Sequence, residues 1–449
     1  MERKISFNKK LDSIVSGLER LVIYRNIYYD DVVQSFLSLA DKLLKNDSSS
    51  DLINAYHSFF GLLAAETELS IYPQVGNPLQ NYLINLILID ENTFSVKAQE
   101  ASLEEMGKGL ISAVKNDLRL MQQLFKVDAE DFRLKIQAEI GTSIILPPWN
   151  ELKTLATKDS QQSAVMMKKK LLATDEWSNL LQEFGSYYEQ MGSGIMAKYQ
   201  AFRWDSLEKE LRGIPSPDPI RLENLVGYIK QKETLVENTK YFLAGFHSNN
   251  ILLYGDRGTG KSSMVKALLH AFPHTPLRLV EITQQQLKEL AQILAVLRSK
   301  PQRFIVFIDD LSFEEYEVEF KYLKAVLEGS LESRPQNVLI YATSNRRHLV
   351  KEYLSERETE EKSELHSRDT VQEKLSLADR FGINLTFTSP DKDQYLEIVA
   401  RLAEERGINL PAEELQRRAM AWELWHNVRS GRTARQFIDY LSAQISAAK

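Results

Sequence analysis

The stretch Ile251-Leu-Leu-Tyr-Gly-Asp-Arg-Gly-Thr-Gly-Lys-Ser-Ser263 decides how the rest of the sequence is interpreted. It begins with four apolar or aromatic residues, as a buried strand does, continues with glycines at 255, 258 and 260, and then places a lysine and two serines. It fits the pattern G-x-x-x-x-G-K-[ST], in which glycines let backbone amides approach an anion because no Cβ intervenes. The order of strand, glycine-rich loop and helix therefore predicts a phosphate-binding loop.

This loop predicts both a ligand and the roles of its residues. Lys261 would reach the β- and γ-phosphates of ATP, and the hydroxyl of Ser262 would bind Mg²⁺. The alternative is a glycine-rich turn that is followed by a lysine with no role in phosphate binding. The predicted nucleotide-binding residues are Gly255, Asp256, Arg257, Gly258, Thr259, Gly260, Lys261, Ser262 and Ser263.

A metal ion at Ser262 also requires a carboxylate on a neighbouring strand. The apolar run Phe304-Ile-Val-Phe-Ile308 ends in Asp309 and Asp310. Asp309 is the expected Mg²⁺ ligand, and Asp310 is expected to act as the base or to orient water. Glu314 is a second candidate for the base. The alternative is that the two aspartates cap the next helix.

The chain of 449 residues is expected to form more than one domain. Residues 1–212 show helical spacing, for example over 129–140 and 171–204, and no strand alternation, so an all-α N-terminal domain of unknown role is expected. The proline-rich segment 212–219 cannot continue a helix and is interpreted as a linker.

The remainder of the chain predicts an α/β domain and a small helical one. Over residues 213–390, strand-like runs alternate with helical patterns, which is typical of a parallel sheet, here of five strands. Residues 391–449 are expected to form a small helical appendix to the sheet domain. The predicted strands are Ile251–Tyr254, Leu277–Ile282, Arg303–Ile308, Val338–Ala342 and Ile383–Phe387.

The composition excludes several classes of function. A formal net charge of −6 gives no general attraction to nucleic acid or to anionic membranes, and the absence of cysteine excludes disulfides and Cys-ligated zinc. The most apolar stretch, Tyr82–Ile89, is far shorter than the roughly 20 residues of a membrane helix. The N-terminus has no continuous apolar run of a secretory signal. A cytoplasmic protein with no membrane partner is expected.

The order of these motifs resembles that of an AAA+ P-loop ATPase. More narrowly, the segments YGDRGTGKSS, FIDDLSFEE, YATSNRRHLV and GRTARQFIDYL resemble the DUF815 group of bacterial ATP-binding proteins, from about Tyr199 onward. The resemblance implies that the strand-turn Leu225-Val226-Gly227-Tyr228, chiefly Val226 and Gly227, packs on adenine and that Asn345 holds the attacking water. An asparagine in a turn at a strand end is the alternative interpretation of Asn345.

The resemblance also implies two arginine roles. Arg380 would reach the nucleotide of a neighbouring subunit and neutralise developing charge, whereas a surface salt bridge is the alternative. By the same resemblance, residues 391–449 would be a C-terminal helical lid. Its Arg435, or Arg432 in its place, would reach back to the phosphates of its own subunit.

Two departures from the family pattern refine the expectation. Most AAA+ proteins have glutamate where this chain has Asp310. The aspartate side chain is shorter by about one carbon–carbon bond, and misplacement of that order can cost ~10²-fold in rate. Slow hydrolysis is therefore expected. The segment Glu281–Leu287 lacks the aromatic residue and the glycine of a polypeptide-threading loop, which disfavours an unfoldase.

The expected function is that of an ATP-hydrolysing oligomer, a ring included, that acts as a switch or remodeller on an unknown client through the N-terminal helical domain. One alternative is a module that holds ATP with little turnover. A P-loop kinase is less favoured, because the chain has no arginine-rich acceptor lid. A nucleic-acid partner rests only on analogy with the replication-initiator and helicase-loader branch.

Overall fold

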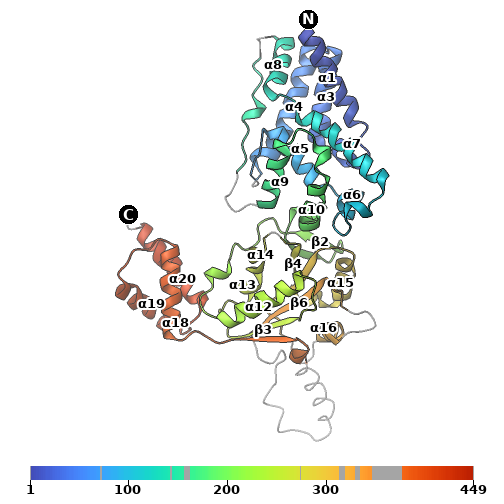
Figure 1. The fold of residues 1–449 in the computed structure, drawn as a ribbon. Coiled ribbons are helices and arrows are strands. Elements are labelled where there is room, and N and C mark those ends of the chain that lie inside the picture. The colour runs from blue at the N-terminus through green and yellow to red at the C-terminus, as the bar shows by residue number, and fades with distance from the viewer. Residues whose placement is uncertain are drawn as a thin grey trace, which may run out of the picture. The chain divides into compact units, whose positions relative to one another are not determined.

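The computed structural model describes residues 2–70, 73–141, 144–155, 162–273, 275–312, 319–328, 334–345 and 377–447. The chain forms two compact units, Met1–Lys198 and Tyr199–Lys449, which Figure 1 colours from blue to green and from green to red. The predicted boundary at residue 212 differs from this division because residues 201–213 form strands of the second unit. Within the described residues, no helix is both long and apolar enough to cross a bilayer.

The first unit contains helices and connecting segments but no strand among its described residues, as predicted. Its helix at 129–140 has the expected bounds. The α-helices are α1 Glu2–Leu18, α2 Arg25–Tyr28, α3 Asp31–Lys45, α4 Ser49–Glu68, α5 Pro78–Ile89, α6 Thr93–Lys97, α7 Lys108–Phe125, α8 Ala129–Ile140, α9 Gln162–Ala173, α10 Leu181–Met191 and α11 Gly194–Lys198, and the 3₁₀ turns are η1 Leu103–Glu105, η2 Trp149–Glu151 and η3 Trp177–Asn179.

Aromatic side chains form the centre of this helical core. Phe36 of α3 packs against Phe59 of α4 and stacks on Phe132 of α8, and the ring centroids lie 5.6 and 5.1 Å apart. Phe59 in turn meets the fully buried Trp149 edge-on. These contacts join three helices and one 3₁₀ turn that are distant in sequence, and such aromatic pairs add about 0.5–1.5 kcal/mol each beyond area burial.

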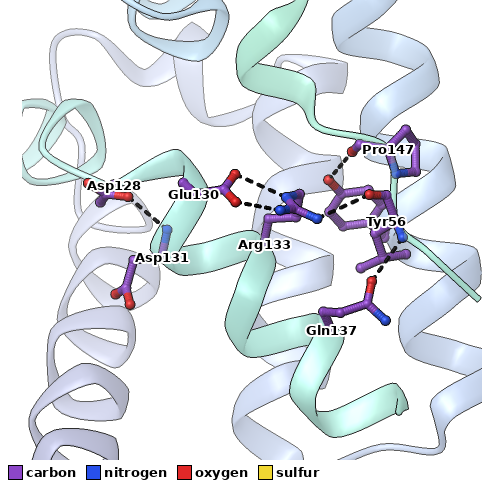
Figure 2. A network of polar contacts seen from close by, with 8 residues as sticks. Tyr56, Asp128, Glu130, Asp131, Arg133, Gln137 and Pro147 are labelled. Atoms are coloured by element: carbon purple, nitrogen blue, oxygen red, sulfur yellow. Dashed lines mark hydrogen bonds and ion pairs between the residues drawn. The ribbon is translucent and has the colours of Figure 1, made fainter. Parts of the chain in front are cut away.

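An extended segment before Trp149 is fixed by polar side chains of α8 and α4 (Figure 2). Arg133, which is paired with Glu130, donates from Nη1 to the carbonyl of Leu146, while Gln137 Oε1 accepts the Leu146 amide. The hydroxyl of Tyr56 donates to the carbonyl of Pro147 at 2.6 Å. These bonds satisfy backbone groups of a segment that belongs to no helix.

The second unit contains one sheet of seven strands, in the order β2-β1-β4-β5-β6-β3-β7. The five strands from β4 to β7 in that order are parallel, and β1 joins them parallel to β4, whereas β2 pairs antiparallel with β1. The strands are β1 Ala201–Asp205, β2 Glu210–Gly213, β3 Ile251–Gly255, β4 Leu277–Ile282, β5 Arg303–Ile308, β6 Val338–Ser344 and β7 Ile383–Phe387.

The predicted α/β class and the five predicted strands are confirmed, but the predicted strand count is wrong. The helical interpretation of 171–204 fails at its C-terminal end, because the pattern divides into α9, η3, α10 and α11 and then becomes β1. The hairpin of β1 and β2 extends the sheet at the β4 edge.

The remaining elements are α12 Ile229–Leu243, α13 Lys261–Lys266, α14 Leu268–Ala271, α15 Leu290–Arg298, α16 Glu319–Glu328 and the 3₁₀ turns η4 Leu222–Asn224 and η5 Gln284–Glu289.

Both faces of the sheet are covered, which explains why the strands are apolar nearly throughout. Alternate strand residues such as Leu253, Phe307 and Tyr341 pack with residues of α12, α13 and α14. The intervening residues, such as Val306 and Ile340, lie on the other face by the strand period and are fully buried. The helix α15 contacts β6.

Three helices follow the last strand and share a core of their own. They are α18 Lys392–Glu405, α19 Ala412–His426 and α20 Gly431–Ala447, called here the C-terminal helices. Tyr395, Ala419 and Phe437 are among the buried residues that join them. They lie beside the sheet in Figure 1, after β7.

The helical unit contains a buried lysine with no acidic partner among the described residues. Lys168 of α9 is 2% exposed, and its Nζ donates to Asn81 Oδ1 at 3.0 Å and to the Pro73 carbonyl at 3.2 Å. Burial lowers the pKa of Lys168 from 10.5 to about 8. Two neutral acceptors therefore offset only part of the cost of burying the ammonium group.

We predict that Lys168→Met stabilises the protein by about 1–3 kcal/mol at pH 7, because it removes a poorly compensated buried charge. The folded pKa lies below the unfolded one, so the unfolded chain binds more protons between pH 8 and 10.5, and the wild type gains stability as pH rises through this window. The difference in the free energy of unfolding between variant and wild type should therefore become smaller between pH 8 and 10.5. Denaturant unfolding of the full chain measures it, with the exposed neighbour Lys169→Met as control; a difference that stays constant with pH would contradict the prediction.

Candidate functional site

The predicted phosphate loop follows β3 and leads into α13, in the context that its sequence pattern requires. Gly255, Gly258 and Gly260 have φ values of +137°, +76° and +91°, a region that side-chain-bearing residues rarely adopt. At Gly255 a Cβ would also lie 1.9 Å from the carbonyl oxygen of Phe387 in β7. Glycine at 255 is therefore required by the close approach of β7 as well as by the turn.

Lys261, the first residue of α13, is 6% exposed and is held by neutral acceptors. Its Nζ donates to the carbonyls of Gly255 and Asp256 at 2.8 and 2.7 Å, and to Oδ1 of Asn345 at 3.1 Å. Burial lowers the pKa of Lys261, while the carboxylates of Asp256, Asp310 and Asp309 act in the opposite direction. The lysine ammonium thus lies at the centre of the loop, next to the end of β6.

The two aspartates after β5 lie against the start of α13 and the end of β6. Asp309 Oδ1 accepts the hydroxyl of Ser262 at 2.5 Å and that of Thr343 at 2.6 Å. Asp310 has a φ of +52°, its amide donates to Thr343 Oγ1 at 2.9 Å, and its Oδ1 accepts from Nδ2 of Asn345. The structure therefore brings together the predicted metal ligands, the predicted base and the predicted water-holding amide.

A cleft of about 670 Å³ opens over these residues. Of the predicted site residues, it is lined by Val226, Arg257, Gly258, Thr259, Gly260, Lys261, Ser262, Ser263, Asp309, Asp310, Asn345 and Arg435. Arg432, the alternative to Arg435, also lines it; the two arginines are three residues apart on α20, which places them on one face of that helix.

Four predicted residues do not line the cleft, and one lies outside the described residues. Gly227, Gly255 and Asp256 shape the surrounding turns, and Gly227 has a φ of +76°. Arg380 is exposed and absent from the lining. Glu314 falls in the segment that the structure does not describe.

The position of Arg380 follows from the strand register. Ile383, the first residue of β7, pairs with Ile251, the first residue of β3, and the phosphate loop leaves β3 at its other end, after Gly255. Five strand residues span about 13 Å. Arg380 precedes β7 and so lies near the amino-terminal ends of β7 and β3, whereas the phosphate loop of its own chain lies at their carboxyl ends.

Sequence reasoning missed several residues of the cleft. Thr343 had no assigned role, because a threonine inside an apolar strand is ordinary β-structure. Apart from residues 225–228, the apolar wall was also missed, because its residues are indistinguishable from core positions in the sequence. The lining residues without a predicted role are Ile220, Asn224, Thr343, Pro390, Ile398, Leu402 and Gly431.

Two contacts join the phosphate loop to the C-terminal helices. Asp256 accepts the amide and the hydroxyl of Ser389, at 2.7 and 2.8 Å, in the segment between β7 and α18, and these bonds hold the pKa of Asp256 below its ordinary value. At the start of α20, the amide of Arg432 donates to the carbonyl of Gly258 at 3.3 Å. The loop is thus bonded to the segment that precedes α18 and to the start of α20.

The chemistry of the cleft suits an anionic ligand with an apolar part. Lys261, Arg257, Arg432 and Arg435 supply positive charge, and residues 220–226 and α18 supply apolar surface. The oxygens of Ser262 and Asp309 are ligands that Mg²⁺ accepts when substrate phosphates complete its shell. Among the described residues, there is no cluster of three or more His, Cys, Asp or Glu side chains that could hold a metal ion.

Comparison with known proteins identifies a family and several solved structures of low sequence identity. The family model described as "Protein of unknown function (DUF815)" matches residues 197–445, which include every residue of the cleft. The RuvB Holliday junction branch migration motor of Thermotoga maritima is 16% identical, with a TM-score of 0.31, and the match covers 50% of this chain and 72% of that chain. The FIGL-1 AAA domain in complex with ADP is 17% identical, with a TM-score of 0.34, and the match covers 50% and 73%. No curated protein matches the chain.

We predict that Gly258→Ala separates the C-terminal helices from the phosphate loop. A Cβ at 258 would lie 2.7 Å from Ser430 Oγ, which cannot move freely because it accepts the amide of Thr433 at 3.1 Å. Gly407→Ala is the matched control, since its φ is +65° but its Cβ would meet nothing within 4 Å. In both variants the free energy of unfolding should fall by about 1–2 kcal/mol because of backbone strain.

Hydrogen exchange distinguishes the two variants. Amides at the start of α20 should exchange faster in Gly258→Ala and at the wild-type rate in Gly407→Ala. Equal exchange in both would show that the contact between Gly258 and α20 does not hold the helices.

Proposed function

The chain belongs to the DUF815 family of proteins of unknown function, so its chemistry must be inferred from the cleft, and we propose that residues 199–449 bind and hydrolyse Mg·ATP there. The observation that carries this proposal is the convergence of the Lys261 ammonium and the bonded pair Ser262–Asp309 at one edge of a parallel sheet. Ligands of open α/β sheets bind outside the carboxyl ends of the strands, which is where this cleft lies.

The proposed binding mode assigns each part of the nucleotide to named residues. Lys261 exchanges its carbonyl acceptors for the β- and γ-phosphates, while Arg257 and either Arg432 or Arg435 add positive charge. Val226, Leu225 and residues of α18 cover the base. Ser262 and Asp309 would hold Mg²⁺, which supplies charge neutralisation of the phosphates when it is bound.

In the proposed mechanism Asp310 orients the attacking water or accepts its proton, and Asn345 positions Asp310. The hydrogen bond from Asn345 Nδ2 occupies Asp310 Oδ1 in this structure, and the aspartate reaches less far than a glutamate would. Both features favour slow turnover. They also favour the second candidate function, a module that binds ATP tightly and hydrolyses little of it. Glu314 stays a second candidate for the base.

The proposal extends to assembly and to a client. Since Arg380 lies near the amino-terminal ends of the strands and its own phosphate loop lies at their carboxyl ends, we propose that it completes the site of a neighbouring copy. ATP would then favour an oligomer, a ring being one form, in which the C-terminal helices act as a lid. The helical unit of residues 1–198 would bind the protein client, so that the nucleotide state controls a switch or remodeller.

We predict that Lys261→Ala abolishes binding of Mg·ADP in calorimetry and release of phosphate from ATP, because no other lysine lines the cleft within the described residues. Lys266→Ala is the control, since Lys266 lies on the same helix but pairs with Glu281 and is absent from the lining. Nucleotide binding by Lys261→Ala at wild-type affinity would refute the proposed site. Tight binding by the wild type, with turnover no faster than in Lys261→Ala, would instead select the second candidate function.

We predict that Asp310→Asn and Arg380→Ala are each inactive and regain activity when mixed. In a mixed oligomer, the intact site of an Arg380→Ala subunit can receive Arg380 from an Asp310→Asn neighbour. Native mass with a non-hydrolysable ATP analogue measures assembly, and phosphate release measures activity. Arg406→Ala, which removes an exposed pair with Asp439, is the control. Full activity of Arg380→Ala alone would rule out the role in trans.

A further inference from the structure

Thr343 lies at the junction of the strands that form the cleft floor. It precedes the end of β6 by one residue, is 1% exposed and pairs with Leu253 of β3. On the other side, Ile308, the last residue of β5, pairs with Ala342, so Asp309 leaves β5 next to Thr343. A polar side chain buried to this degree needs hydrogen-bond partners.

The hydrogen bonds of Thr343 have a defined direction. The amide of Asp310 can only donate, so at 2.9 Å Thr343 Oγ1 accepts from it. The carboxylate of Asp309 accepts, so the hydroxyl proton of Thr343 is directed to Oδ1 at 2.6 Å. The hydroxyl therefore joins the side chain of one aspartate to the backbone of the next.

This arrangement fixes the orientation of the Asp309 carboxylate. Ser262 donates to the same oxygen at 2.5 Å, so two hydroxyls, one from α13 and one from β6, meet Oδ1. A metal would bind a lone pair of the Ser262 oxygen, so the hydroxyl proton could still be donated to Asp309. Thr343 would hold the same carboxylate from β6 while Ser262 holds it from α13.

The same residue supports the turn that carries Asp310. A φ of +52° is unfavourable for aspartate and must be held by its surroundings. Thr343 bonds to this turn twice, through Oγ1 to the Asp310 amide and through its carbonyl to the Leu311 amide at 2.7 Å. Loss of the hydroxyl would leave the Asp310 amide without this acceptor.

We propose that Thr343 is a positioning residue that holds Asp309 in the orientation needed to bind Mg²⁺ and holds the turn that presents Asp310. This inference rests on the proposed function of the cleft. Residues that hydrogen-bond to a metal ligand typically contribute 10- to 100-fold to metal affinity.

Thr343→Val tests the inference, because it keeps the shape of the side chain and removes only the hydroxyl. With a fluorescent ADP analogue as the probe, the Mg²⁺ concentration for half-maximal binding should rise about 10- to 100-fold, while binding in EDTA changes less than about twofold. In steady-state hydrolysis, kcat should fall about 10- to 100-fold with little change in KM at saturating Mg²⁺. Thr343→Ser should restore both properties to within about threefold.

Thr239→Val is the matched control. Thr239 is also fully buried and also makes two hydrogen bonds, to the Leu235 carbonyl and the Tyr341 hydroxyl, but it does not line the cleft. It should leave the Mg²⁺ dependence at the wild-type value. If Thr343→Val does not fold, Thr343→Ala against Thr343→Ser gives the same comparison.

Three results would overturn the inference. Wild-type Mg²⁺ dependence in the folded valine or alanine variant would show that the hydroxyl does not position Asp309. Equal weakening with and without Mg²⁺ would show a general structural role only. Absence of nucleotide binding by the wild type would overturn the proposed function itself, an outcome distinct from the other two.

Discussion

The parallel register of β5, β6 and β3 is the constraint on which the candidate site depends. Because the carboxyl ends of the three strands meet at one edge, residues separated by up to 84 positions in sequence, such as Lys261 and Asn345, lie within hydrogen-bond distance. A one-residue slip in any pairing would turn Thr343 and its neighbours to the opposite face. The fully buried strand residues on both sides of the sheet oppose such a slip, so the hydrophobic core determines the geometry of the polar cluster.

The sequence allowed much of this site to be predicted, because its main signals are local. The loop Gly255–Ser262 and the pair Asp309–Asp310 are each contiguous, and each follows an apolar run that is typical of a strand covered on both faces. Their contact, the bond between Ser262 and Asp309, follows from the α/β class once β3 and β5 lie in parallel on either side of β6. The DUF815 resemblance was confirmed by the family match over residues 197–445.

The parts that sequence reasoning did not predict depend on long-range pairing. Ala201–Asp205 follows a helical pattern and has no clear alternation, and it forms a strand because β4 offers it an edge more than seventy residues later. The functional interest of Thr343 is visible only when Asp309 and Asp310 are placed beside it. The choice between Arg432 and Arg435 is left open by spacing for a physical reason, since one helical face presents both to the cleft.

The double attachment of the phosphate loop has a mechanical consequence. Asp256 is bonded to Ser389 and Gly258 to Arg432, so one short loop is attached both before the first and at the start of the third helix of a bundle that otherwise has its own core. A change in the orientation of that bundle must therefore strain the loop. A ligand that changes the conformation of the loop must in turn favour a different orientation of the bundle. Free-energy coupling between two sites is reciprocal. A macromolecule that binds the bundle at one angle would therefore change the affinity of the cleft for an anion, and the anion would change the affinity for that macromolecule by the same factor.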